Sequence, residues 1–123
     1  MTNHADNPVV RLWNAAWLDR DPDTLASLVA DPYVRHGREG TTQMSPTEFA
    51  AQVAGALGHF KGTELSVDDL ATVGNMVYGR VRMVGVDLGT GTPVTISWLG
   101  HFRIVDGRVA ESWMLHQTDL DWG

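Results

Sequence analysis

The sequence has 123 residues, which is room for one hydrophobic core, and we expect a single domain over residues 1–123. Its formal net charge of −6 argues against nucleic acid as a partner, because phosphate backbones are bound by basic surfaces. The absence of cysteine excludes disulfides, thiol nucleophiles and thiolate metal ligands. The first residues are polar, and no apolar run approaches the roughly 20 residues of a membrane helix, so we expect a cytoplasmic protein without a membrane partner.

Three helix signals lie in the first half of the chain. Asn7 and Asp21 each precede a proline, which is typical of a helix N-cap followed by the first helical residue. Ser45 and Glu48 have the spacing of a capping box, and the Asp-Pro pair at 31–32 is expected to end the second helix. Apolar residues recur at helical spacing behind each start: Val9, Leu12, Trp13, Ala16 and Trp17; Leu25, Leu28 and Val29; Phe49, Val53, Ala56 and Leu57.

The rest of the chain has the composition of strands separated by glycine-containing turns. Asp106 and Gly107 stand between two alternating segments, a strong signal for a hairpin turn. We predict a short strand after the second helix and four long antiparallel strands after the third, with the ranges 33–36, 65–72, 75–87, 93–105 and 108–118.

This order predicts an α+β fold, with three helices on one face of a curved sheet. Because helices rarely fill a concave sheet completely, we expect a cavity between the two layers, of the kind that binds small ligands.

Two segments carry a resemblance to a known family. The stretch 102–113 reads Phe-Arg-Ile-Val-Asp-Gly-Arg-Val-Ala-Glu-Ser-Trp, and the stretch 31–36 ends on His36. Both are similar to segments of the polyketide-cyclase-like (SnoaL-like) family of the nuclear transport factor 2-like superfamily, over about residues 7–119. The resemblance implies a cone-shaped, cystatin-like mixed or antiparallel sheet with the helices on its concave face, and a small molecule bound in the cone. Relatives include isomerases, dehydratases, cyclases, epoxide hydrolases and plain binders, so the resemblance is specific for the fold and not for the reaction.

Two kinds of relative suggest site residues. In ketosteroid isomerase the general base is an aspartate on the first strand, and an ungapped alignment puts His36 at that position. Limonene epoxide hydrolase uses an arginine and two aspartates, and the matching positions here hold Arg80, Arg82 and Met114. The arginine is retained and both carboxylates are missing, which argues against the epoxide hydrolase mechanism.

The histidines are the candidate proton carriers, because imidazole titrates near neutral pH. His36 is the expected base, with a surface histidine as the alternative. The resemblance implies that Met114 and His116 line the cavity, while a simple in–out alternation would place His101 and His116 on the solvent side. Periodicity leaves this choice open, because one bulge reverses the phase of a strand.

Other residues complete the expected site. Arg80 would stabilise developing negative charge, and His116 or Tyr33 would donate a hydrogen bond. The residues expected to bind substrate are Trp13, Trp17, Tyr33, Arg82, Ser97, His101 and Met114.

We therefore interpret the chain as a cofactor-independent acid–base enzyme of the cyclase, isomerase or dehydratase type. Its substrate would be a small apolar molecule with a carbonyl or hydroxyl group, from polyketide or terpenoid metabolism. The alternatives are a non-catalytic ligand-binding or dimerisation module, and an epoxide-opening enzyme without the usual carboxylates.

Cofactors and metals are not expected. No glycine-rich phosphate loop precedes a helix, and the three candidate histidines lie on separate strands without a close-spaced ligand pair.

A homodimer is expected from one apolar stripe of the long strands. If the helices cover the opposite face, Ile96, Trp98, Phe102 and Trp113 would form an exposed patch too large for a monomer.

Overall fold

The computed structural model describes residues 4–122. Helix α1 (Pro8–Trp13) continues into a π-helical turn, η1 (Asn14–Leu18), and α2 (Pro22–Ser27) follows. The remaining elements are β1 (Val29–Gly37), β2 (Gly40–Met44), α3 (Pro46–Ala56), β3 (Phe60–Val73), β4 (Met76–Asp87), β5 (Pro93–Val105) and β6 (Arg108–Thr118). None of the helices within residues 4–122 has the length and hydropathy needed to span a membrane.

The predicted caps are present and explain where the helices begin. The Asn7 side chain accepts from the backbone N–H of Val9 at 3.0 Å, and Asp21 caps α2 in the same way. Ser45 and Glu48 exchange two hydrogen bonds of 3.1 and 3.0 Å in a capping box at the start of α3. These local signals fix the helix starts where the sequence predicts them.

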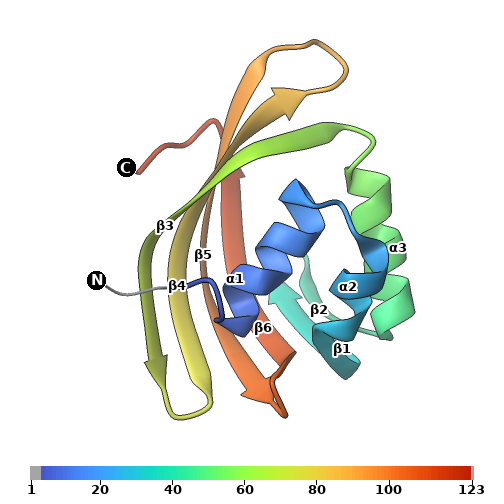
Figure 1. Ribbon diagram of the computed structural model, residues 1–123, viewed down its shortest axis with the longest axis vertical. Coiled ribbons are helices and arrows are strands. Elements are labelled where there is room, and N and C mark those ends of the chain that lie inside the picture. Colours follow the sequence, from blue (N-terminus) through green and yellow to red (C-terminus); the bar gives the residue numbers. More distant parts are fainter. Residues whose placement is uncertain (1–3, 123) are drawn as a thin grey trace.

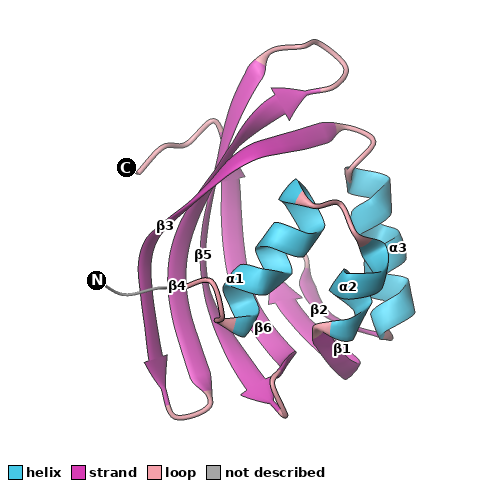
Figure 2. Cartoon of the chain, viewed as in Figure 1, coloured by secondary structure: helices cyan, strands magenta, loops and turns pink. Residues whose placement is uncertain are grey.

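Six strands form one curved, unclosed sheet in the order β2-β1-β6-β5-β4-β3. The β1–β6 pair is parallel and all other neighbours are antiparallel, so the sheet is mixed. Figures 1 and 2 show α1, α2 and α3 together on one side of this sheet, within its curve. The expected α+β fold is confirmed, with its helices on the concave face. We call this the inner face, and the opposite one the outer face.

Three details differ from the sequence prediction. Strand β2 was not expected, and β1 starts at Val29, a residue that the helical spacing had included in the second helix. Strand β3 starts five residues earlier than expected, at Phe60. Both β1 and β2 are short and mostly not buried, so their formation depends on pairing with β6 and with each other rather than on their own hydrophobic pattern.

The core lies between the helices and the inner face. The ring of Trp13 meets that of Phe102 edge to face, with centroids 5.3 Å apart. Trp98 and Phe102 are both buried there, while Trp113 points to the outer face. The stripe from which a dimer was expected is therefore not continuous: its β5 members belong to the core of the monomer.

A bulge in β6 causes this division. Arg103 pairs with Glu111 and Ile104 pairs with Val109, so Ala110 is the extra residue. As a result Val109 is fully buried, whereas Glu111 two residues later bonds to groups on the outer face.

Candidate functional site

A chamber of about 300 Å³ lies between the helices and the inner face of the sheet. This volume is at the lower end of the range for small-molecule sites, roughly 300–1,000 Å³. Helices α1, η1 and α3 form one wall, and strands β1, β5 and β6 form the other. The lining residues are Leu12, Trp13, Ala16, Trp17, Tyr33, Arg35, Phe49, Gln52, Val53, Ala56, Ile96, Trp98, Phe102, Met114 and His116.

Three tryptophans dominate the apolar part of the chamber. The ring of Trp98 lies 6.4 Å from that of Trp13 and 6.2 Å from that of Trp17, between centroids. Trp17 also meets Phe60 edge to face at 5.8 Å. Because these rings pack against one another, they form a rigid apolar surface. Binding of an apolar ligand to it costs little side-chain conformational entropy.

A buried hydroxyl pair lies in the β1–β6 wall. The Tyr33 and Ser112 oxygens share a hydrogen bond of 2.9 Å, and the two residues are only 2% and 1% exposed. Burial raises the pKa of Tyr33, so the phenol stays protonated and keeps its O–H as a donor.

Arg35 brings a positive charge to the same wall. Its Nη1 donates to the side-chain oxygen of Gln52 at 2.7 Å, and its guanidinium carbon lies 5.2 Å from the ring centre of Phe49. Within residues 4–122 no carboxylate lies at ion-pair distance from Arg35. The positive charge is therefore not neutralised by the described part of the protein.

The chamber opens at this end into a second recess of about 370 Å³. The residues that line both spaces are Arg35, Gln52, Met114 and His116. Of these two spaces, Trp13, Trp17 and Trp98 line only the chamber. The recess adds Arg38 and other residues of the β1–β2 turn. We call this shared boundary the mouth.

His116 lies at the mouth, beside the ring of Trp98 at 5.9 Å. Its pKa is lowered, mainly by partial burial and then by the positive charges of Arg35 and Arg38. The lowered pKa keeps the imidazole neutral at neutral pH, and a neutral imidazole can accept a proton.

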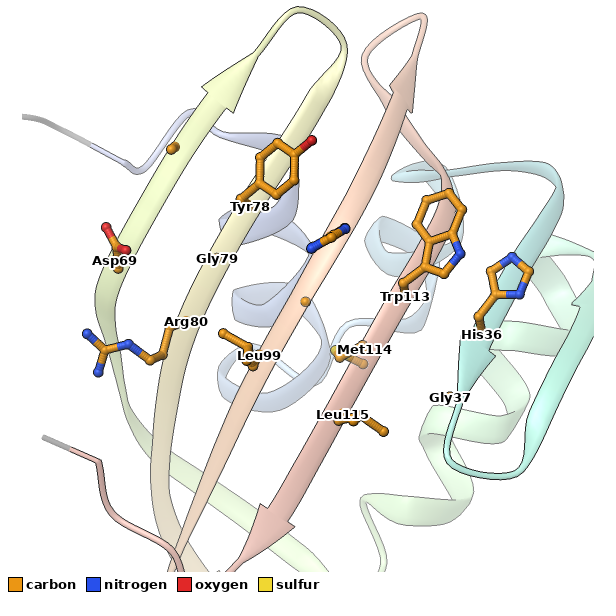
Figure 3. A pocket seen from close by; sticks show the side chains of 13 residues that line it. His36, Gly37, Asp69, Tyr78, Gly79, Arg80, Leu99, Trp113, Met114 and Leu115 are labelled. Atoms are coloured by element: carbon orange, nitrogen blue, oxygen red, sulfur yellow. The ribbon is translucent and has the colours of Figure 1, made fainter.

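His36 does not face the chamber. Its Nε2 bonds to a carboxylate oxygen of Glu111 at 2.6 Å, and its Nδ1 bonds to the Thr41 hydroxyl at 2.8 Å. Its ring is stacked on Trp113, with centroids 5.0 Å apart (Figure 3). Both ring nitrogens are engaged by other side chains on the outer face.

Among the described residues, His36, Arg80 and His116 are not all three around one space, although His36 and His116 both line the recess. His36 and Arg80 line a groove of about 490 Å³ on the outer face, with the helices behind the sheet in the view of Figure 3. His101 lies in this groove too, 4.7 Å from the ring of Tyr78.

Two more residues expected to bind substrate lie outside the chamber. Arg82 forms ion pairs with Asp68 at 2.7 Å and with Asp121 at 2.9 Å. Ser97 is fully buried and donates its hydroxyl to the backbone carbonyl of Leu120. Trp13, Trp17, Tyr33, Met114 and His116 do line the chamber.

The histidines also bear on metal binding. His36 and His101 lie on the outer face and His116 on the inner face, so the three do not share one site. Within residues 4–122, no three His, Asp or Glu side chains lie close enough together to hold a metal ion.

Sequence reasoning missed Arg35, Gln52 and Ser112. A signal for Arg35 was present, because residues two apart on a strand share a face and Tyr33 was already expected inside. The same rule puts His36 outside. Gln52 carries no comparable signal, because it lies on the exposed side of the α3 pattern.

The fold and the chamber define a class of small α+β proteins in which helices and a curved sheet enclose an apolar pocket with few polar groups. A family model described as the SnoaL-like domain matches residues 10–112. The chain therefore belongs to the SnoaL-like family, with a nuclear transport factor 2-like fold. No curated protein matches the sequence significantly.

Several solved structures share this fold. An LEH-like epoxide hydrolase from M. tuberculosis has a TM-score of 0.74 at 18% identity, over 92% of this chain and 82% of its own. IdmH from Streptomyces antibioticus, described as a candidate polyketide cyclase, has a TM-score of 0.71 at 22% identity, over 95% and 93%. A candidate isomerase from Bacillus subtilis has a TM-score of 0.79 at 11% identity, over 95% and 90%. At these identities the likeness concerns the fold.

Proposed function

We propose that the chamber is the active site of an acid–base enzyme that needs no cofactor. The reaction would be an isomerisation, cyclisation or dehydration of a small, largely apolar molecule with a carbonyl or hydroxyl group. The observation that carries the proposal is the mouth of the chamber, where the exposed imidazole of His116 lies beside the ring of Trp98 and lines the same apolar space as Arg35. The direction of its pKa shift, downward, agrees with this role.

In this proposal His116 takes the proton and Tyr33 donates to the substrate oxygen. His116 is suited to the first role because its imidazole remains neutral at working pH. Tyr33 is suited to the second because burial raises the pKa of its phenol, which therefore remains a donor as charge develops on the oxygen. Arg35 adds positive potential at the same wall.

These roles differ from those that the sequence suggested. The base is His116 instead of His36, and the nearby cation is Arg35 instead of Arg80. The reason is geometric: Arg80 lies on the outer face of the sheet, away from the chamber. His36 lines the recess but not the chamber, and its two ring nitrogens are bonded to Thr41 and Glu111.

A ligand-binding protein without catalysis is the second candidate. The wall of three tryptophans favours it, because apolar surface alone suffices to hold a ligand. An epoxide-opening enzyme is not proposed, because none of the described residues that line the chamber is acidic.

Proton abstraction can be tested without the natural substrate. We expect the protein to accelerate exchange of the α-protons of 1-tetralone, a bicyclic ketone, in D₂O, followed by NMR. His116→Gln should lower that acceleration by roughly 10²-fold or to the buffer background. Acceleration should also fall as the pH drops through the lowered pKa of His116.

A matched control separates chemistry from folding. His101→Gln makes the same change on the outer face and should leave exchange unaltered. Binding of the ketone without accelerated exchange would support the ligand-binding protein and refute the enzyme. Unaltered exchange in His116→Gln would remove His116 from the mechanism.

We also propose that the protein forms a homodimer through the outer groove. Tyr78, Leu99 and Leu115 are 39%, 54% and 60% exposed there, an apolar patch that a partner would cover. Asp69 and Arg80 line the same groove. In a two-fold interface each could face the other residue of the second copy, which makes the patch self-complementary in charge.

A further inference from the structure

We propose that the ligand of the chamber carries a carboxylate, which Arg35 binds at the mouth while the apolar body lies among the tryptophans. This inference rests on the proposed function only in that it takes the chamber to be a ligand site. It adds the chemical class of the ligand, an apolar acid, and the residue that selects it.

The first argument is the unbalanced charge of Arg35. Its guanidinium has a hydrogen bond to Gln52, a ring contact with Phe49 and an interaction with the Tyr33 phenol, and none of these partners is charged. Taking an arginine partly out of water without an opposite charge is unfavourable, and a bound anion removes that cost.

The second argument is the donor geometry. Nη1 of Arg35 donates to the side-chain oxygen of Gln52, and the guanidinium also acts on the Tyr33 phenol through a side-chain hydrogen bond. A guanidinium carries five N–H donors, so these two partners do not use all of them. The remaining N–H groups can bind a ligand, and the amide NH₂ of Gln52 lies opposite on the helical wall of the mouth. A guanidinium presents its donors as a planar fork, which matches the two oxygens of a carboxylate.

The third argument is the position of this group. Arg35 and Gln52 line both the chamber and the outer recess, whereas Trp13 and Trp17 line only the chamber. A charged head bound at the mouth keeps part of its hydration, so its desolvation costs less than it would deep inside. The apolar body can at the same time occupy the part of the chamber that the tryptophans line.

The surrounding charges support an anion at this place. Arg38, in the β1–β2 turn, lines the recess beside Arg35, and both positive charges act on His116. Glu39 is the one acidic residue among the described groups that line the recess, and it is exposed on the turn. A carboxylate at the mouth therefore meets a net positive potential.

The experiment compares two probes that differ only in charge. Isothermal titration calorimetry measures binding of 1-naphthylacetate and of its neutral amide, 1-naphthylacetamide, to the wild-type protein. We expect the carboxylate to bind roughly 10- to 100-fold more tightly than the amide, as for hydrogen bonds to a charged group. Arg35→Gln should abolish this preference and leave the affinity for the amide nearly unchanged.

Arg80→Gln is the matched control, because it removes the same charge from the outer groove and should keep the preference. Equal binding of both probes to the wild type, or a preference that survives Arg35→Gln, would overturn the inference while leaving the chamber a ligand site. Failure of both probes to bind would instead count against the chamber itself, and so against the proposed function. The wild-type comparison needs no variant, so the inference can be refuted even if Arg35→Gln does not fold.

Discussion

Replacing His36 by alanine should lower stability, because this side chain ties β1 to β2 and β6. The bond to Glu111 joins side chains that are 28% and 20% exposed, so solvent reduces its contribution to about 1 kcal/mol. The exposed bond to Thr41 adds about 0.5 kcal/mol, and the stacking on Trp113 about 0.5–1 kcal/mol. The sum is about 2 kcal/mol, which corresponds to a fall in Tm of roughly 6–10 °C for a chain of this size.

The assay is thermal unfolding followed by circular dichroism, together with ligand binding measured well below the Tm. We expect His36→Ala to melt earlier while binding in the chamber is retained. His101→Ala is the control, since His101 also lies in the outer groove and its ring contacts only Tyr78 among the described aromatic residues. A variant with the wild-type Tm would refute this reasoning. If that variant had also lost the α-proton exchange described above, His36 would return to the role of base.

Three further predictions concern the mouth and the outer groove. Arg35→Gln should raise the pKa of His116 towards its ordinary value, because one of the charges that lower it is removed; burial and Arg38 still act. The titration of the His116 ring proton by NMR measures this shift, and the same pKa in both proteins would contradict the assigned electrostatics. Because folding lowers this pKa, His116 contributes stability that is present above its unfolded pKa, near 6.5, and is lost as the pH falls through the folded value. Sedimentation should find a dimer at micromolar concentration, and Leu115→Glu, in the outer groove, should convert it to a monomer; a wild-type monomer would refute the proposed interface.

Local signals explain what the sequence could predict. The caps at Asn7, Asp21 and Ser45 and the turn at Asp106-Gly107 act through neighbouring backbone groups, so the helix starts and the last hairpin follow from a few residues each. Strand β2 has no such signal. It exists because β1 offers an edge to pair with, which is a property of the assembled sheet.

The location of the site could be predicted only in part. The alternation from Tyr33 already indicates that Arg35 points inward and His36 outward, but the resemblance to isomerases drew attention to His36. The bulge at Ala110 is different, because no residue type marks it in advance. In a β6 strand without this bulge, Val109 and Glu111 would share a face. Trp113 would then lie on the same face as Trp98 and Phe102, as the predicted apolar stripe required.

Charge shows most clearly why composition could not give the function. The chain carries 15 acidic and 9 basic side chains, a balance that by itself favours cationic partners. None of the described residues lining the chamber is acidic, and Arg35 at its mouth has no carboxylate partner within residues 4–122. Exposed charges farther away than about 8–10 Å are screened by salt, whereas a guanidinium at an apolar wall is screened much less. A ligand at the mouth therefore responds to Arg35 more than to the net charge, and an acidic protein can select an anion.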